Sequence, residues 1–353
     1  MSIRIGQVAF WASLSVAMAM LLLFVLVPSV FAADVNAASC SNGDIQTAVN
    51  AAANGDRVIV PSCAAGSWTG SVTIPNTKGI TLMGQGSTNT IISVGSTNQL
   101  VVTTSSSNQP FRLTGFTFKH THSAGTAFMQ ILGTATDWRV DNNVFDSQNT
   151  AGGVYSIRVG DTGANTEAYT YGVIDHNEFK NRDFDTSIFV EWPRGVLDPI
   201  ASGDWIWGEA AQRGTAQAVY IEDNTFSGST PNSASQVIDC RWGCKYVLRY
   251  NTIHNPWIST HSGCTNFGRN PVWQEIYKNT FTDDASRYGG NQIEMRSTSG
   301  IVFNNDFAAA ANKYVVGVDH ERSYRTDCSG TYNARCDGTR SFDENTAGQS
   351  GWR

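Results

Sequence analysis

The sequence predicts an all-β fold, a single solenoid of the parallel β-helix type, from two observations. First, a short phrase centred on an asparagine returns along the chain, with short β-branched and aromatic runs around it and no helical periodicity. Second, the steps between the asparagines are 34, 47, 27, 28 and 26 residues, and three of the five are close to one coil of about 27 residues. The asparagines are Asn143, Asn177, Asn224, Asn251, Asn279 and Asn305.

Each copy of the phrase has an aliphatic residue three positions before the asparagine and an apolar residue two positions after it. A degenerate earlier copy spans Leu113 to Phe118. Strands of successive coils stack about 4.8 Å apart, so equivalent residues form straight columns. Asparagine tolerates a left-handed backbone bend, and stacked amides form hydrogen-bonded ladders. We therefore predict structural roles for the asparagine, aliphatic and phenylalanine columns.

The start of the chain is typical of a secretory signal peptide, residues 1–33. Arg4 precedes a long charge-free apolar run, and Val30 and Ala32 occupy the small-residue positions of a cleavage site. We expect cleavage after Ala32 and a secreted protein, whether extracellular, periplasmic or on the cell surface. A membrane association follows only if the segment stays uncleaved, since its length suffices to span a bilayer.

Residues 34–353 are predicted to form the β-helix domain. A polar start at Ser41, apolar residues at helical spacing and a closing Gly55 indicate a short amphipathic helix. We expect this helix to cover the open N-terminal end of the solenoid, ahead of strands at residues 57–60, 72–74 and 80–82. No comparable cap precedes Arg353, so we expect the chain to be a fragment of a longer solenoid.

The seven cysteines suit an oxidising compartment, where their odd number leaves at least one thiol over. Cys40 and Cys63 bracket one helix and one strand, and we expect them to pair. Cys328 and Cys336 would close a small loop. Only one further disulfide can form among three other cysteines, which are Cys240, Cys244 and Cys264. The sequence leaves open which two of them pair.

Charge excludes one broad class of partner. The chain has 24 Lys plus Arg against 30 Asp plus Glu, a formal net charge of -6 and a pI near 5.5, which gives no basic field for general nucleic-acid binding. Its 17 Phe, 10 Trp and 11 Tyr supply ample apolar surface, so disorder is excluded too. We expect a monomer.

The opening of the domain resembles a known family. Residues 40–86, with the phrases Gly55-Asp-Arg-Val-Ile-Val-Pro61 and Gly79-Ile-Thr-Leu-Met-Gly-Gln-Gly86, are similar to secreted right-handed parallel β-helix proteins of the pectate lyase-like superfamily. With the later coils, the resemblance covers about residues 40–320. It implies a right-handed coil. It is specific for fold rather than activity, since the superfamily holds lyases, glycoside hydrolases, epimerases and adhesins.

The column two residues before each asparagine is predicted to point outward by strand alternation. Its neighbours lie on the order of 5 Å apart, where like charges raise one another's pKa unless a cation intervenes. Either Arg249 or a bound Ca2+ would supply that cation. An alternative is that Arg249 and Glu222 form only an exposed ion pair. The column reads Asp141, Asp175, Glu222, Arg249, Tyr277 and Phe303.

Pectate lyases place Ca2+ between aspartates of the wall and substrate carboxylates, and use an arginine as base. The phrase Gly172-Val-Ile-Asp-His-Asn177 is similar to the family phrase that carries a calcium-binding aspartate. The resemblance therefore implies Asp175 as a calcium ligand. Arg249 is the catalytic candidate by its place in the column, since the chain has no copy of the family's segment around its catalytic arginine. Column geometry extends the metal set to Asp141 and Glu222.

Two steps of the repeat are too long for one coil, so loops are predicted within residues 146–171 and 180–218. Three tryptophans of the second loop, Trp192, Trp205 and Trp207, would either stack on sugars or pack onto the wall. Residues after the Asn251 coil would line the same groove, together with Glu275. Two are further catalytic candidates, His254 and His261, and two are substrate-binding candidates, Trp257 and Arg296.

Two hypotheses of function follow. The first is a secreted protein that binds or degrades polysaccharide, in its specific form a Ca2+-assisted lyase acting on an acidic, uronate-containing glycan. The second is a non-catalytic carbohydrate-binding or cell-surface adhesion module on the same scaffold. The sequence leaves open whether the protein is an enzyme.

Overall fold

The computed structural model describes residues 32–95, 98–121, 126–148, 154–160, 169–181, 186–191, 216–228, 235–241, 244–260, 273–283, 292–296, 300–308 and 316–319. The predicted signal segment lies almost entirely outside them. The compact unit Asp34–Arg353 holds every described strand and one helix, α2 (Asn42–Ala51). Within the described residues, no helix is long and apolar enough to cross a membrane.

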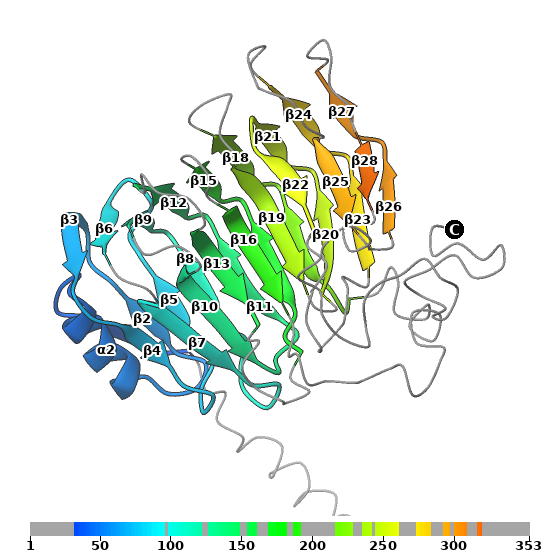
Figure 1. Cartoon of the computed structure of the whole chain (residues 1–353). Helices are drawn as coiled ribbons and strands as arrows, with labels where there is room; N and C mark the ends of the chain where they lie inside the picture. The colour runs from blue at the N-terminus through cyan, green and yellow to red at the C-terminus, as the bar shows by residue number, and fades with distance from the viewer. Residues whose placement is uncertain are drawn as a thin grey trace, which may run out of the picture. The chain divides into compact units, whose positions relative to one another are not determined.

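The strands stack into three parallel sheets, and each sheet takes one strand from every coil (Figure 1). Sheet A runs, in spatial order, through β1 (Asp34–Asn36), β2 (Arg57–Ile59), β5 (Thr81–Met83), β8 (Arg112–Thr114), β11 (Trp138–Asp141), β14 (Gly172–Asp175), β17 (Val219–Glu222), β20 (Lys245–Arg249), β23 (Trp273–Tyr277) and β26 (Gly300–Phe303). A sheet in which every pair is parallel requires the chain to return to the same end after each coil.

Sheet B contains β3 (Cys63–Trp68), β6 (Thr90–Val94), β9 (Thr117–His120), β12 (Val144–Ser147), β15 (Glu178–Asn181), β18 (Thr225–Gly228), β21 (Thr252–His254), β24 (Thr280–Thr282) and β27 (Asp306–Phe307). Sheet C contains β4 (Val72–Ile74), β7 (Leu100–Thr104), β10 (Ala127–Gly133), β13 (Tyr155–Val159), β16 (Thr186–Glu191), β19 (Gln236–Arg241), β22 (Trp257–Ser259), β25 (Ile293–Arg296) and β28 (Val316–Asp319). The predicted parallel β-helix is confirmed.

The interior is filled by the predicted columns. The aliphatic column of sheet A is fully buried and contains Leu113, Val140, Ile174, Ile221, Leu248 and Ile276. In sheet B the rings of Phe145, Phe179 and Phe226 stack at centroid distances of 5.0 and 4.8 Å. These spacings follow the separation of neighbouring strands, so one phrase in the sequence corresponds to one coil.

The asparagine ladder is confirmed, with one correction. The Oδ1 atom of Asn224 accepts from the backbone N (2.9 Å) and Nδ2 (3.1 Å) of Asn177, and Asn224 makes the same pair of bonds to Asn251. The left-handed residue, however, is the one before each asparagine, as at His176 (φ 54°) and Tyr250 (φ 60°). The asparagine therefore satisfies the backbone of the bend rather than adopting the bend itself.

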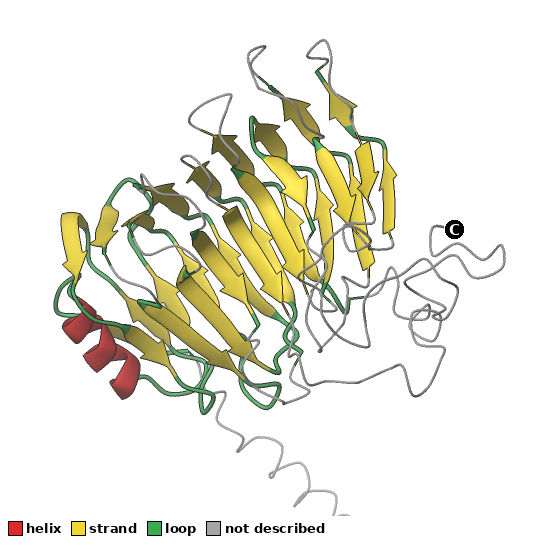
Figure 2. Ribbon diagram, in the orientation of Figure 1, coloured by secondary structure: helices red, strands yellow, loops and turns green. Residues whose placement is uncertain are grey.

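Helix α2 caps the N-terminal end of the stack, where Figure 2 shows it beside the first strands. Ser41 is its N-cap and accepts a hydrogen bond from the backbone of Asp44, while Ile45 and Val49 are buried. The helix ends at Ala51, short of the predicted Gly55.

The expected disulfide between Cys40 and Cys63 is present, and the open choice resolves to a bond between Cys240 and Cys244. Such bonds are typical of oxidising compartments. The remaining cysteines, Cys264, Cys328 and Cys336, lie outside the described residues.

Candidate functional site

The predicted column of charged residues exists on sheet A. Asp141, Asp175, Glu222 and Arg249 are consecutive partners in the register of β11, β14, β17 and β20. Their side chains lie opposite the interior aliphatic column, as alternation requires. The side chain of Asp141 is nonetheless 0% exposed, because neighbouring side chains on the wall cover it.

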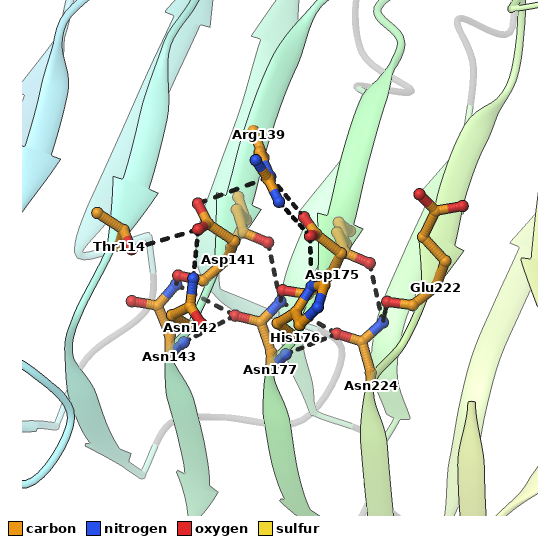
Figure 3. A network of polar contacts seen from close by, with 12 residues as sticks. Thr114, Arg139, Asp141, Asn142, Asn143, Asp175, His176, Asn177, Glu222 and Asn224 are labelled. Atoms are coloured by element: carbon orange, nitrogen blue, oxygen red, sulfur yellow. Dashed lines mark hydrogen bonds and ion pairs between the residues drawn. The ribbon is translucent and has the colours of Figure 1, made fainter. Parts of the chain in front are cut away.

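The covering groups come from a second outward column, two residues earlier on each strand. Arg112 donates from Nε to Oδ1 of Asp141 (2.7 Å) and from Nη2 to Oδ2 (2.6 Å). Arg139 bonds both oxygens of Asp175 in the same way, one coil further on (Figure 3). Bidentate guanidinium–carboxylate pairs are the strongest of the charged hydrogen bonds, so both aspartates are fixed.

Further donors complete this network. Nδ2 of Asn142 bonds Oδ2 of Asp141, and Nδ1 of His176 lies 2.7 Å from Oδ2 of Asp175. Burial raises the pKa of Asp175, but the hydrogen bonds from Arg139 and His176 outweigh it and hold that pKa below its usual range. Asp175 is therefore ionised in the folded protein.

This geometry does not fit the calcium hypothesis at the aspartates. A Ca2+ site needs several oxygen ligands turned toward one point, whereas the oxygens of Asp141 and Asp175 are turned toward guanidinium groups. A divalent cation there would also lie beside Arg112 and Arg139. Among the residues that the structure describes, no group of three His, Cys, Asp or Glu is placed to hold a metal ion.

Glu222 and Arg249 form the ion pair that the sequence analysis kept as an alternative. Nε of Arg249 lies 2.5 Å from Oε2 of Glu222, and Nη1 donates to the hydroxyl of Tyr277 at 2.9 Å. Burial lowers the pKa of Arg249, but the bonds to Tyr277 and Glu222 prevail and raise it above its ordinary value. Arg249 is thus bonded to Glu222 and Tyr277, and its catalytic role stays a prediction.

The other predicted site residues do not join Arg249. His254 is on β21 of sheet B, where Nδ1 lies 3.0 Å from Oγ1 of Thr282, and Trp257 is on β22 of sheet C. Arg296 ends β25, also in sheet C. A coil turns from one wall to the next within a few residues, so closeness in sequence does not give a shared wall. His261, Trp192, Trp205 and Trp207 lie outside the described residues.

A charged cluster that the sequence analysis did not identify lies on the outer side of sheet C. On β13, β16 and β19 the inward residues, such as Ile157, Ile188 and Ile238, are fully buried. Residues between them face the other way, and Arg158, Phe189 and Asp239 are consecutive register partners there. Two residues after Phe189 and Asp239 come Glu191 and Arg241, which also align.

Each arginine of this cluster is held by a carboxylate. Arg158 bonds Glu191, and Nη2 of Arg241 lies 3.1 Å from Oδ2 of Asp239. The side chains of Glu191 and Asp239 are only 1% and 3% exposed, whereas those of Arg158 and Arg241 are 21% and 30% exposed. The carboxylates therefore orient the guanidiniums, and the guanidiniums are the groups within reach of a ligand.

Aromatic rings fix the spacing of the two cations. The ring centroid of Phe189 is 5.9 Å from Cζ of Arg158 and 5.3 Å from Cζ of Arg241, and the ring of Tyr155 stacks on it at 4.4 Å. Burial, followed by the charge of Asp239, raises the pKa of Tyr155, so its hydroxyl holds its proton at neutral pH. We name Arg158, Glu191, Asp239, Arg241, Phe189 and Tyr155 the sheet C cluster.

One expectation about this region is corrected. Glu191 was expected within the inserted loop, but it is the last residue of β16. The sequence signal for this strand was the alternation of side chains. Ile188 and Val190 are the interior residues, and Phe189 and Glu191 alternate with them on the outer side. The signal is weak because Phe189 is itself apolar. No repeated phrase marks sheet C, because segments of different length precede and follow its strands.

Comparisons with known proteins give weak likenesses only. No family model matches the chain, and no curated protein matches it. An alginate lyase from a Paenibacillus species is 15% identical, with a TM-score of 0.35 over 81% of this chain and 99% of its own. A pectin methylesterase from carrot is 10% identical, with a TM-score of 0.38 over 87% and 94%. The catalytic domain of a GH87 α-1,3-glucanase is 10% identical, with a TM-score of 0.27 over 82% and 60%.

Proposed function

We propose that the protein binds an acidic polysaccharide along the outer face of sheet C and cleaves it there by β-elimination. The observation that carries this proposal is the pair of partly exposed guanidiniums, Arg158 and Arg241, each held by a buried carboxylate on either side of Phe189. Guanidinium groups that are already oriented in the free protein suit the planar carboxylates of a uronate polymer.

The spacing of the cations favours a polymer over a single small anion. Arg158 is on β13 and Arg241 is on β19, two coil steps apart, which is about 9.6 Å along the stack. A chain laid along the axis would meet one guanidinium after the other. The buried ring of Phe189 lies between them, and the partly exposed ring of Tyr155 stacks on it. The exposed part of Tyr155 is an aromatic surface of the kind that suits the apolar faces of sugar rings.

In β-elimination, a hydroxide ion from solvent removes the proton on C5 of the uronate and becomes water, and the bond from C4 to the glycosidic oxygen breaks. A C4–C5 double bond forms, and the leaving oxygen takes up a proton. Arg158 or Arg241 would neutralise the uronate carboxylate, which stabilises the charge that develops beside C5. The hydroxyl of Tyr155, whose pKa is raised, would supply the proton to the leaving oxygen.

A second candidate, a non-catalytic binding module, is favoured by one observation. Glu191 and Asp239 are buried and bonded to arginines, so within the described residues of this cluster neither carboxylate is open to take a proton from substrate. This candidate keeps the binding of acidic polysaccharide and omits the cleavage.

The test measures binding and cleavage separately on a panel of uronic-acid polymers, with and without Ca2+. Arg158→Ala and Arg241→Ala should each weaken binding in affinity electrophoresis by roughly tenfold. Arg57→Ala is the matched control, since it removes an arginine of an exposed ion pair on sheet A and should leave binding unchanged. Wild-type affinity in both sheet C variants would contradict the proposal.

Cleavage is followed by the ultraviolet absorbance of the unsaturated product. If wild type forms it, Tyr155→Phe should keep the affinity and lower the turnover rate. Binding without unsaturated product from any polymer establishes the non-catalytic candidate instead.

A further inference from the structure

Arg241 lies inside a ring closed by a disulfide bond. Cys240 is the residue before it on β19, and Cys244 precedes β20 directly. Both cysteines are 0% exposed, and the backbone N of Cys244 donates to the carbonyl oxygen of Arg241 at 3.3 Å. Arg241 is therefore tied on one side by its pairing with Glu191 in the sheet, and on the other side by the ring.

The cross-link is not needed to close so short a passage between sheets. Only residues 242–244 separate β19 from β20. Residues 297–299 separate β25 from β26 in the same position of a later coil, and they are Ser-Thr-Ser. The same passage is thus made elsewhere in this chain without cysteine.

Global stability is a poor explanation for the bond as well. A disulfide restricts the unfolded chain more strongly when it closes a longer loop. The Cys240–Cys244 bond spans 4 positions, whereas the Cys40–Cys63 bond spans 23. The second bond is the one suited to stabilising the fold.

The neighbouring coils differ at this point. The passage from sheet C to sheet A takes residues 192–218 in the coil before and residues 260–272 in the coil after. Only this coil between them makes the passage short and cross-linked, and it is the coil that presents Arg241, whose guanidinium stands 5.3 Å from the ring of Phe189.

We infer that the Cys240–Cys244 disulfide is a positioning device for Arg241. Ligand binding at the sheet C cluster therefore depends on the oxidation of these two cysteines to the disulfide. This inference rests on the proposed function and adds its redox dependence. With the bond open, the backbone at Arg241 keeps its strand pairing but loses its second anchor, and the guanidinium loses its fixed distance from Phe189 and Arg158.

The experiment compares two double variants of the full chain, Cys240→Ser/Cys244→Ser and Cys40→Ser/Cys63→Ser. The first should weaken binding of a uronic-acid polymer roughly tenfold with little change in Tm, since small misplacements of a binding group are costly. The second should lower Tm and leave the affinity of the folded protein unchanged. Where cleavage is measurable, the first should raise KM more than it lowers kcat.

Several outcomes would overturn the inference. One is unchanged affinity in Cys240→Ser/Cys244→Ser while Arg241→Ala binds weakly, which leaves the proposed function standing. Because serine hydroxyls suit a buried site poorly, Cys240→Ala/Cys244→Ala is a second form. Failure of both forms to fold would show that the bond serves the fold. Unchanged affinity in Arg241→Ala itself would instead reject the proposed function.

Discussion

Arg112 and Asp141 form a two-pronged ion pair between adjacent coils, with Nε 2.7 Å from Oδ1 and Nη2 2.6 Å from Oδ2. The pair runs diagonally, from one outward column of sheet A to the next. Arg139 and Asp175 repeat this pair one coil later. The two arginines and two aspartates on this part of the wall are therefore paired with one another. This arrangement gives the carboxylates of Asp141 and Asp175 a structural role.

Removal of the buried carboxylate should destabilise the fold. Asp141 is 0% exposed and Arg112 is 40% exposed, so Asp141→Ala leaves a guanidinium that is only partly hydrated and takes an acceptor from Asn142. We expect a loss of about 2–3 kcal/mol in the free energy of unfolding. Asp34→Ala is the control, since its equivalent pair with Arg57 is 45% exposed on both sides and should contribute about 0–1 kcal/mol. Equal losses in the two variants, measured by denaturant unfolding, would contradict the role of burial.

The depressed pKa of Asp175 predicts an acid-dependent loss of stability. Burial opposes the depression, but Arg139 and His176 prevail, so the folded protein binds the proton less readily than the unfolded chain does. The stabilisation is present above the ordinary carboxyl pKa of about 4 and is lost as pH falls through the lower folded value. The Tm of wild type should exceed that of Asp175→Asn at neutral pH, and the difference should shrink on acidification. A difference that stays constant down to about pH 2 would refute this assignment.

Interruption of the asparagine ladder should cost more than shortening it. Asn224 is buried and bonds both of its ladder neighbours, together with the carbonyl oxygens of Ile174 (2.8 Å) and Glu222 (3.0 Å). Asn224→Ala leaves several of these groups unpaired, and we expect a loss of about 3 kcal/mol or more. Asn305→Ala, at the last rung that the structure describes, should cost less. Thermal unfolding of the two variants gives the comparison, and the reverse order would show that the ladder does not act as a unit.

Calcium should not act through the aspartates of sheet A. Because guanidinium groups bond the oxygens of Asp141 and Asp175, any effect of Ca2+ on Tm should be the same in wild type, Asp141→Asn and Asp175→Asn. The measurement is the Tm in Ca2+ against that in a chelator. A calcium-dependent stabilisation that either variant abolishes would restore these residues as ligands.

The sequence predicted the register of the walls because the asparagine phrase is itself the bend between sheets A and B. One phrase per coil makes Asn177 and Asn224 vertical neighbours although 47 residues separate them. It also predicted the Cys40–Cys63 bond and the capping helix. It did not predict the Arg112–Asp141 bond, because column periodicity shows which residues share a column and says nothing of diagonal reach between columns.

The sequence by itself determined the solenoid, its interior columns and the order of charges along one wall, because burial and the backbone bends impose a repeating pattern that survives inserted segments. Only the tertiary structure decided which walls hold their guanidiniums against which carboxylates. It turned Asp141 and Asp175 toward arginines, and it brought Arg158 and Arg241 to either side of Phe189. The physical reason is that the ion-pair partner of a long charged side chain depends on the length of that side chain and on how much water remains around the pair. The spacing of residues along the chain does not encode either quantity.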